Sequence, residues 1–202
     1  MGLPDCAVMT PVEEVAIGAG DLADPEVLRL LGEHLADMHA TSPAHSVHAL
    51  DVSGLADPRV TFWTLTVAGR VQGCVALKQL DPHHGELKSM RVAAGARGLG
   101  LGGRLLDHVL AEARRRGYRR LSLETGSMAF FEPARRLYQR AGFVPCPPFA
   151  DYRPDPNSSF FTLTLDPDPT PAADGEGAAA RSSPVEVRAT GSSPAPCCGR
   201  RG

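Results

Sequence analysis

The stretch Arg97-Gly98-Leu99-Gly100-Leu101-Gly102-Gly103 lies between a segment typical of a β-strand and a segment typical of an α-helix. Glycines in such a turn remove Cβ atoms, so backbone N–H groups are able to close around a phosphate. The N-terminus of the following helix adds partial positive charge at the same place. The stretch therefore predicts a phosphate-binding loop, and the kind of phosphate decides the function.

Hydrophobic patterns place regular elements on both sides of this loop. Before it we expect a strand, a helix and three further strands, at Val12–Ile17, Pro25–Ala40, Val60–Val67, Val71–Leu80 and Glu86–Ala93. After it we expect a helix, a strand, a helix and a strand, at Leu101–Arg116, Leu121–Thr125, Pro133–Arg140 and Ser158–Leu165. The polar stretch Thr41–Arg59 shows no clear periodicity.

This order, β-α-β-β-β-α-β-α-β, contains one strand–loop–helix–strand unit around the glycines. Such a βαβ unit requires parallel pairing and a right-handed crossover. The three strands before it are joined by short turns, one of them at Asp81–Gly85, and so pair antiparallel. We therefore expect an α/β (α+β) fold in which a mixed, mostly antiparallel sheet is flanked by helices.

Length and composition predict one folded domain, residues 1–165. The chain has 202 residues, 43% of them hydrophobic, which is enough for one core. After about Asp166 the sequence is dominated by Pro, Ala, Gly and Ser and has no large apolar side chains. Such a segment cannot offset its ordering entropy, so we expect residues 166–202 to be a disordered tail.

Charge and composition also exclude several classes of partner. A net charge of -2 gives no electrostatic footprint for nucleic acid. No apolar run approaches the ~20 residues that cross a bilayer, and no secretory leader is present, so we expect a cytoplasmic protein without a membrane partner. The five cysteines never form a C-x-x-C pair, and we predict no metal site.

Two familiar phosphate-binding patterns can be compared with the glycine stretch. Gly98-x-Gly100-x-x-Gly103 fits a dinucleotide fingerprint, with Glu124 as the acidic residue downstream, and would indicate an NAD-type oxidoreductase. The long connection from Val92 to Gly98 and the antiparallel strands before it weaken this alternative. A P-loop is excluded, because Arg104 and Leu105 stand where a Lys and a hydroxyl residue are required.

Three motifs together resemble a third class, the GCN5-related N-acetyltransferase (GNAT) superfamily. Arg97-x-x-Gly100-x-Gly102 matches its [QR]-x-x-G-x-[GA] signature, and Glu86–Val92 looks like the strand before it. Downstream, Ala134–Phe143 matches the family's A-x-x-L-Y-x-x-x-G-F helix and turn. The resemblance covers about residues 10–165. It departs from the family at the Asn that often precedes this helix, where Ser127 is the candidate replacement.

The resemblance implies acetyl-CoA as co-substrate. Its pyrophosphate would lie on the N–H groups of the glycine loop and its pantetheine along the strand before it. The residues predicted to bind it are Met90, Arg91, Val92, Arg97, Gly98, Leu99, Gly100, Leu101, Gly102 and Gly103.

The resemblance also implies two catalytic residues. Glu86, at the start of the strand that leads into the loop, is the candidate general base that removes the amine proton. The alternatives are that Glu86 is a solvated carboxylate at a turn, and that Glu124 is the base. Tyr138 is the candidate acid that protonates the leaving thiolate, and its alternative role is core packing.

The predicted function is acetyl transfer from acetyl-CoA to a primary amine of a small molecule; the alternative is a non-catalytic acyl-CoA-binding regulatory module. By resemblance, Pro25–Ala40 and Ser42–Asp51 occupy the place of the acceptor pocket, with His45, His48 and the loop Asp151–Ser158 as candidate lining. Arg91 and Arg153 are candidates to pair with an acceptor carboxylate, which would indicate a small anionic amine such as an amino acid. An edge after Phe143–Phe149 is a candidate for strand pairing in a homodimer.

Overall fold

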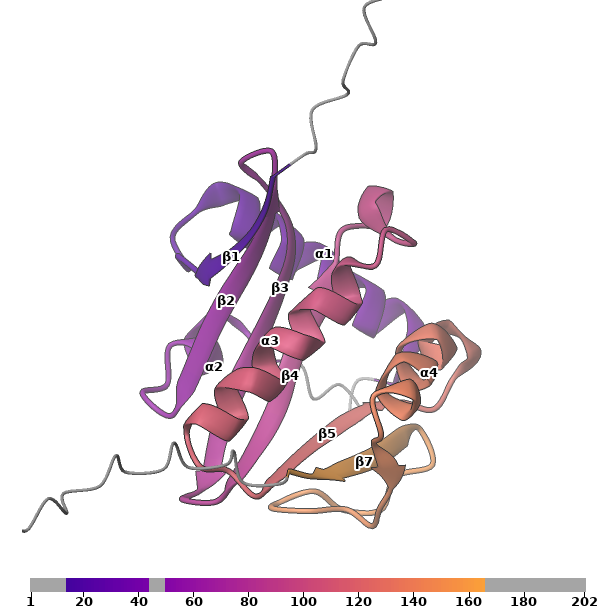
Figure 1. The fold of residues 1–202 in the computed structure, drawn as a ribbon. Coiled ribbons are helices and arrows are strands. Elements are labelled where there is room, and N and C mark those ends of the chain that lie inside the picture. Colours follow the sequence, from indigo (N-terminus) through magenta and orange to yellow (C-terminus); the bar gives the residue numbers. More distant parts are fainter. Residues whose placement is uncertain (1–13, 44–49, 166–202) are drawn as a thin grey trace, which may run out of the picture. The chain divides into compact units, whose positions relative to one another are not determined.

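The computed structural model describes residues 14–43 and 50–165, all within the first of the two units into which the chain divides, Met1–Pro169. Their strands form one seven-stranded sheet in the order β1-β2-β3-β4-β5-β7-β6 (Figure 1). The strands are β1 (Val15–Ala19), β2 (Val60–Val67), β3 (Arg70–Asp81), β4 (His84–Val92), β5 (Arg120–Gly126), β6 (Val144–Pro145) and β7 (Ser158–Thr164). Every neighbouring pair is antiparallel except β4 and β5. The predicted mixed, mostly antiparallel sheet is confirmed.

Among the described residues, four α-helices and two short 3₁₀ turns connect these strands. They are α1 (Pro25–Thr41), α2 (Val52–Leu55), α3 (Leu101–Arg115) and α4 (Glu132–Arg140), with the turns η2 (Ala94–Ala96) and η3 (Ala129–Phe131). Helix α1 begins where the sequence signals it, because the Asp24 carboxylate accepts a hydrogen bond from the Glu26 N–H at 2.7 Å. Among the described residues, no helix is long and apolar enough to span a membrane.

Helices α1 and α3 cover opposite faces of the sheet. Cys74 of β3 and Arg91 of β4 are direct partners in the ladder, and Arg91 reaches Asp37 of α1. Gly73 precedes Cys74 in β3, and a Cβ atom on Gly73 would lie 2.9 Å from the side chain of Leu105 in α3. Since side chains alternate across a strand, the two helices sandwich β3 and β4. In Figure 1, α3 crosses in front of these strands.

Helix α3 supplies much of the core because its apolar residues recur at helical spacing. Its buried residues are Leu101, Leu105, Leu106, Val109, Leu110 and Ala113. Burying such side chains contributes roughly 1.5–3 kcal/mol each, before the cost of ordering them. Helix α3 therefore packs tightly against the sheet, and this packing fixes the position of its N-terminus relative to β3 and β4.

The predicted turn before β4 is wrong in its length, and two short elements were not predicted. The turn predicted at Asp81–Gly85 is shorter, because Asp81 pairs with His84 in the ladder and its side chain accepts the His83 N–H at 2.7 Å. Glu86 is therefore the third residue of β4 rather than the first. Within Thr41–Arg59, α2 forms on an Asp51 cap, but one turn is too short to show periodicity. The two-residue β6 gives no alternating pattern.

Substitution of Gly73 by Ala tests the close contact of α3 with β3. Its Cβ would lie 2.9 Å from the Leu105 side chain and 3.0 Å from the Arg91 carbonyl oxygen. We expect the free energy of unfolding in urea to fall by about 1–3 kcal/mol from overpacking. Gly18→Ala, in β1 with no atom within 4 Å of the new Cβ, is the control and should change it by less than about 0.5 kcal/mol. Equal effects of the two variants would contradict this packing.

Candidate active site

The site begins where β4 and β5 stop pairing. Their parallel ladder runs from His84 with Arg120 to Leu87 with Leu123. Just beyond it, β4 contains a bulge, since Ala76 pairs with Lys88 but Cys74 pairs with Arg91. Ser89, inside this bulge, has a φ of 48°, which is unusual for a residue other than glycine. The two strands diverge from their paired ends (Figure 1), and a gap opens between them.

A cavity of about 100 Å³, here called the strand-gap pocket, occupies this gap. Its walls come from the ends of β4 and β5, from α1 and from α4. Its lining residues are His34, Met38, Ser42, Leu87, Lys88, Ser89, Met90, Glu124, Thr125, Gly126, Phe131, Ala134 and Tyr138. Within the described residues, the Ser89 hydroxyl is buried here without a hydrogen-bond partner.

A second cavity of about 520 Å³, the glycine-loop groove, follows the predicted phosphate loop. It is lined by nine of the residues predicted to bind the donor: Met90, Arg91, Val92, Arg97, Gly98, Gly100, Leu101, Gly102 and Gly103. The tenth, Leu99, does not line it, and its side chain is 67% exposed. The structure thus places nine of the ten predicted residues around one cavity, at the N-terminus of α3.

Two glycines of this loop adopt backbone conformations that disfavour other residues. Gly98 has a φ of 82° and Gly100 a φ of 75°, both in the left-handed region. Gly100 is also the N-cap residue of α3, so this conformation directs the chain into the helix. A Cβ on Gly102 would lie 3.4 Å from Leu137 of α4, so this glycine leaves room between the two helices.

The two cavities meet. The residues that line both are His34, Met38, Met90, Phe131, Ala134 and Tyr138. A ligand in the glycine-loop groove can therefore extend past these side chains into the gap between β4 and β5. We call this meeting point the junction.

Tyr138 and Glu124 both line the strand-gap pocket. Tyr138 is buried, and its hydroxyl contacts the Met90 sulfur at 3.8 Å. Burial, together with the negative charge of Glu124, raises the pKa of Tyr138, so its phenol stays protonated. Burial likewise raises the pKa of Glu124. The pair thus combines a proton donor with a carboxylate of increased basicity.

Glu86 lies elsewhere, beside a third cavity of about 540 Å³, the loop cavity, which residues 150–156 cover. Only 2% of its side chain is exposed, so it is not a solvated carboxylate at a turn. Tyr152 donates a hydrogen bond to Glu86 at 2.6 Å, and Lys88 donates one to Tyr152 at 2.7 Å. Lys88 lines both the loop cavity and the strand-gap pocket, so this hydrogen-bonded chain ends at the gap.

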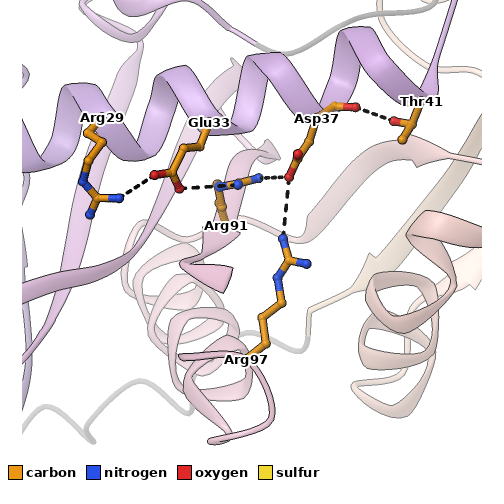
Figure 2. A network of polar contacts seen from close by, with 6 residues as sticks. All are labelled: Arg29, Glu33, Asp37, Thr41, Arg91 and Arg97. Carbon is orange, nitrogen blue, oxygen red and sulfur yellow. Dashed lines mark hydrogen bonds and ion pairs between the residues drawn. The ribbon is translucent and has the colours of Figure 1, made fainter. Parts of the chain in front are cut away.

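Arg91, predicted to pair with an acceptor carboxylate, is instead paired with carboxylates of the protein itself. Figure 2 shows it between two carboxylates of α1, with Asp37 at 2.8 Å and Glu33 at 3.7 Å. Only 7% of its side chain is exposed. Asp37 also pairs with Arg97 of the loop at 3.6 Å, so it links α1 to β4 and to the glycine loop. Arg153 lines the loop cavity, where its predicted role stays a prediction.

His34 and Met38 lie in the helix, and Tyr152 in the loop, that the sequence placed at the acceptor pocket, but the sequence did not single out these three residues. The spacing of His34 and Met38, four residues apart on one helix face, was the available signal for two of them. Ser127, the candidate for the missing Asn, donates a hydrogen bond to the Pro156 carbonyl at 2.7 Å instead. His45 and His48 lie outside the described residues.

Comparisons with known proteins agree with this geometry. The model of the acetyltransferase (GNAT) family matches residues 28–143. The chain is 51% identical over 142 residues to the "Uncharacterized N-acetyltransferase YsnE" of Bacillus subtilis (strain 168), covering 70% of this chain and 94% of that protein. The crystal structure of an inferred acyl-CoA N-acyltransferase from Klebsiella pneumoniae is similar, with a TM-score of 0.64 and 30% identity over 75% of this chain and 98% of that one.

A more distant fold match has a bound ligand. It is a GNAT family acetyltransferase from Elizabethkingia anophelis with acetyl-CoA bound, at a TM-score of 0.53 and 20% identity. It covers 75% of this chain and 98% of that one.

Substitution of Asp37 by Asn tests the link between α1, β4 and the glycine loop. It would leave the buried Arg91 charge with Glu33 alone, which is 3.7 Å away. We expect the free energy of unfolding to fall by about 1–3 kcal/mol, allowing for the partial exposure of Asp37. Glu132→Gln removes an exposed ion pair with Arg136 and should cost less than about 0.5 kcal/mol. If both variants unfold at the same urea concentration, the link does not stabilise the fold.

Proposed function

The chain belongs to the GNAT family of acetyltransferases, and from this membership we propose that it transfers an acetyl group from acetyl-CoA to a primary amine of a small molecule. Membership confirms the resemblance drawn from the three motifs and removes the dinucleotide alternative. The observation that carries the proposal is the junction, where a glycine-lined groove opens onto a pocket that holds both an acid and a base.

The glycine-loop groove fits a CoA thioester. At one end, the left-handed glycines and the N-terminus of α3 present backbone N–H groups suited to a pyrophosphate. Charge-assisted hydrogen bonds of this kind contribute about 1.5–3 kcal/mol each, more than the ~0.3–1 kcal/mol of a helix dipole. Toward the junction, the lining changes to Met90, Phe131, Ala134 and Leu137, which suits a pantetheine arm.

The acid and the base divide the proton transfers between them. An amine with a pKa near 10.4 is only about one part in 10³ neutral at pH 7, so a nearby base assists the attack. We assign this role to Glu124 rather than Glu86, because Glu124 lines the pocket that Tyr138 also lines. Tyr138 then gives its phenolic proton to the CoA thiolate as the C–S bond breaks.

Calorimetric titration tests the donor. Acetyl-CoA should bind, and Gly100→Val should weaken binding more than Arg97→Ala, because Gly100 needs a positive φ whereas Arg97 is half-exposed and only loosely paired. Gly95→Val is the control, since a Cβ on Gly95 meets no atom within 4 Å. It should change affinity by less than about threefold. A larger loss for Arg97→Ala would refute the backbone cradle.

Release of CoA thiol with a panel of amines tests catalysis. Glu124→Gln should lower kcat by roughly 10²–10⁴-fold, and Tyr138→Phe should lower it while acetyl-CoA affinity persists. Because the pKa of Glu124 is raised, kcat should fall on acidification through a pKa above the ordinary value for Glu. If Glu86→Gln lowered kcat more than Glu124→Gln, the role of general base would belong to Glu86. Binding without turnover by any amine would indicate a non-catalytic acyl-CoA-binding module.

A further inference from the structure

The junction contains one polar side chain that the mechanism above does not use. Of the residues shared by the two cavities, only His34 and Tyr138 carry an N–H or O–H group in the side chain. They come from different helices, α1 and α4. Within the described residues, no hydrogen bond engages the His34 ring, and the residue is partly buried.

From this placement, and resting on the proposed function, we propose that the His34 imidazole donates a hydrogen bond to the thioester carbonyl oxygen of the bound donor. A thioester that follows the groove to the gap has to pass the junction, since the same side chains line both cavities. Apart from His34, the side chains at the junction carry thioether, phenyl, methyl and phenol groups, and in such surroundings a hydrogen bond to a carbonyl oxygen has a large effect.

The charge state of His34 suits this role better than that of a base. Burial, and then the positive charge of Arg91, lower the pKa of His34 to about 4, while Asp37 opposes the shift. The ring is therefore neutral at pH 7 and keeps one N–H donor. Arg91 is fixed in place by its carboxylates on α1, so its charge acts on His34 continuously.

The reaction balances with His34 unchanged. The amine nitrogen forms a bond to the thioester carbon, and the carbonyl π pair moves onto oxygen, where the His34 N–H stabilises the charge. The pair then returns, the C–S bond breaks, Glu124 holds the amine proton and Tyr138 supplies the thiol proton. His34 neither gains nor loses a proton.

Carbon-13 NMR of bound [1-¹³C]acetyl-CoA tests the hydrogen bond without any acceptor. A hydrogen bond to the carbonyl oxygen moves its resonance downfield, so His34→Leu should move it upfield, whereas His34→Gln, which retains an N–H donor, should keep part of the shift. His39→Leu, on an exposed position of the same helix, should leave it unchanged. Affinity for CoA, which lacks the carbonyl, should be within about threefold of wild type in all three variants.

Kinetics give a second readout. With an amine that is acetylated, His34→Leu should lower kcat by about 100-fold, the effect of removing one such donor, with little change in the KM for acetyl-CoA. An unmoved resonance with unchanged kcat, or a parallel loss of CoA affinity, would overturn the assignment while leaving the proposed function intact. Failure of the wild-type protein to bind acetyl-CoA would overturn both.

Discussion

Strand pairing between β4 and β5 ends at Leu87 and Leu123, and the arrangement of the site depends on that end. A parallel pair that continued would close the gap with backbone hydrogen bonds and side chains. The bulge at Ser89 prevents this by adding a residue to β4 and altering its course. The strand-gap pocket and the junction both depend on this one interruption.

Helix α1, which forms one wall of the strand-gap pocket, is held to the rest of the fold by two kinds of contact. The buried residues of α1, which are Val27, Leu30 and Leu31, lie in its first half. Its second half, which carries His34 and Met38, is joined to β4 and to the glycine loop through Asp37 and Glu33 (Figure 2). Ion pairs fix direction and distance in a way that apolar contacts do not, so the side of α1 that lines the two cavities is positioned by charge.

The parts of the site that could be predicted are those that depend on a particular backbone conformation, because residue types signal such conformations in the sequence. Gly98 and Gly100 adopt positive φ angles, which glycine accepts more readily than other residues, and the amphipathic pattern of α3 predicts the helix after them. The parts that could not be predicted depend on contacts between distant segments. The sequence suggested that Arg91 was free to pair with an acceptor carboxylate. Its partner in the structure is Asp37, which lies on a helix far from Arg91 in the chain.

Glu86 shows the same limit. The sequence placed it at the start of a strand, directly after a turn at Asp81–Gly85, yet the ladder extends back to His84 and Glu86 is buried. Tyr152, its partner, lies in a loop with no periodic pattern. The choice between Glu86 and Glu124 therefore needed the three-dimensional arrangement.

The surroundings of Cys74 determine the protonation state of its thiol. Cys74 is fully buried in β3, and its thiol lies 3.4 Å from the carbonyl oxygen of Ser89 in the bulge. Burial raises its pKa to about 12, so the thiol stays protonated at pH 7. A thiolate, rather than a protonated thiol, is the form of cysteine that attacks a thioester. Because Cys74 is protonated, fully buried and absent from the lining of the three cavities, it is a core residue without the exposure or the charge of a nucleophile.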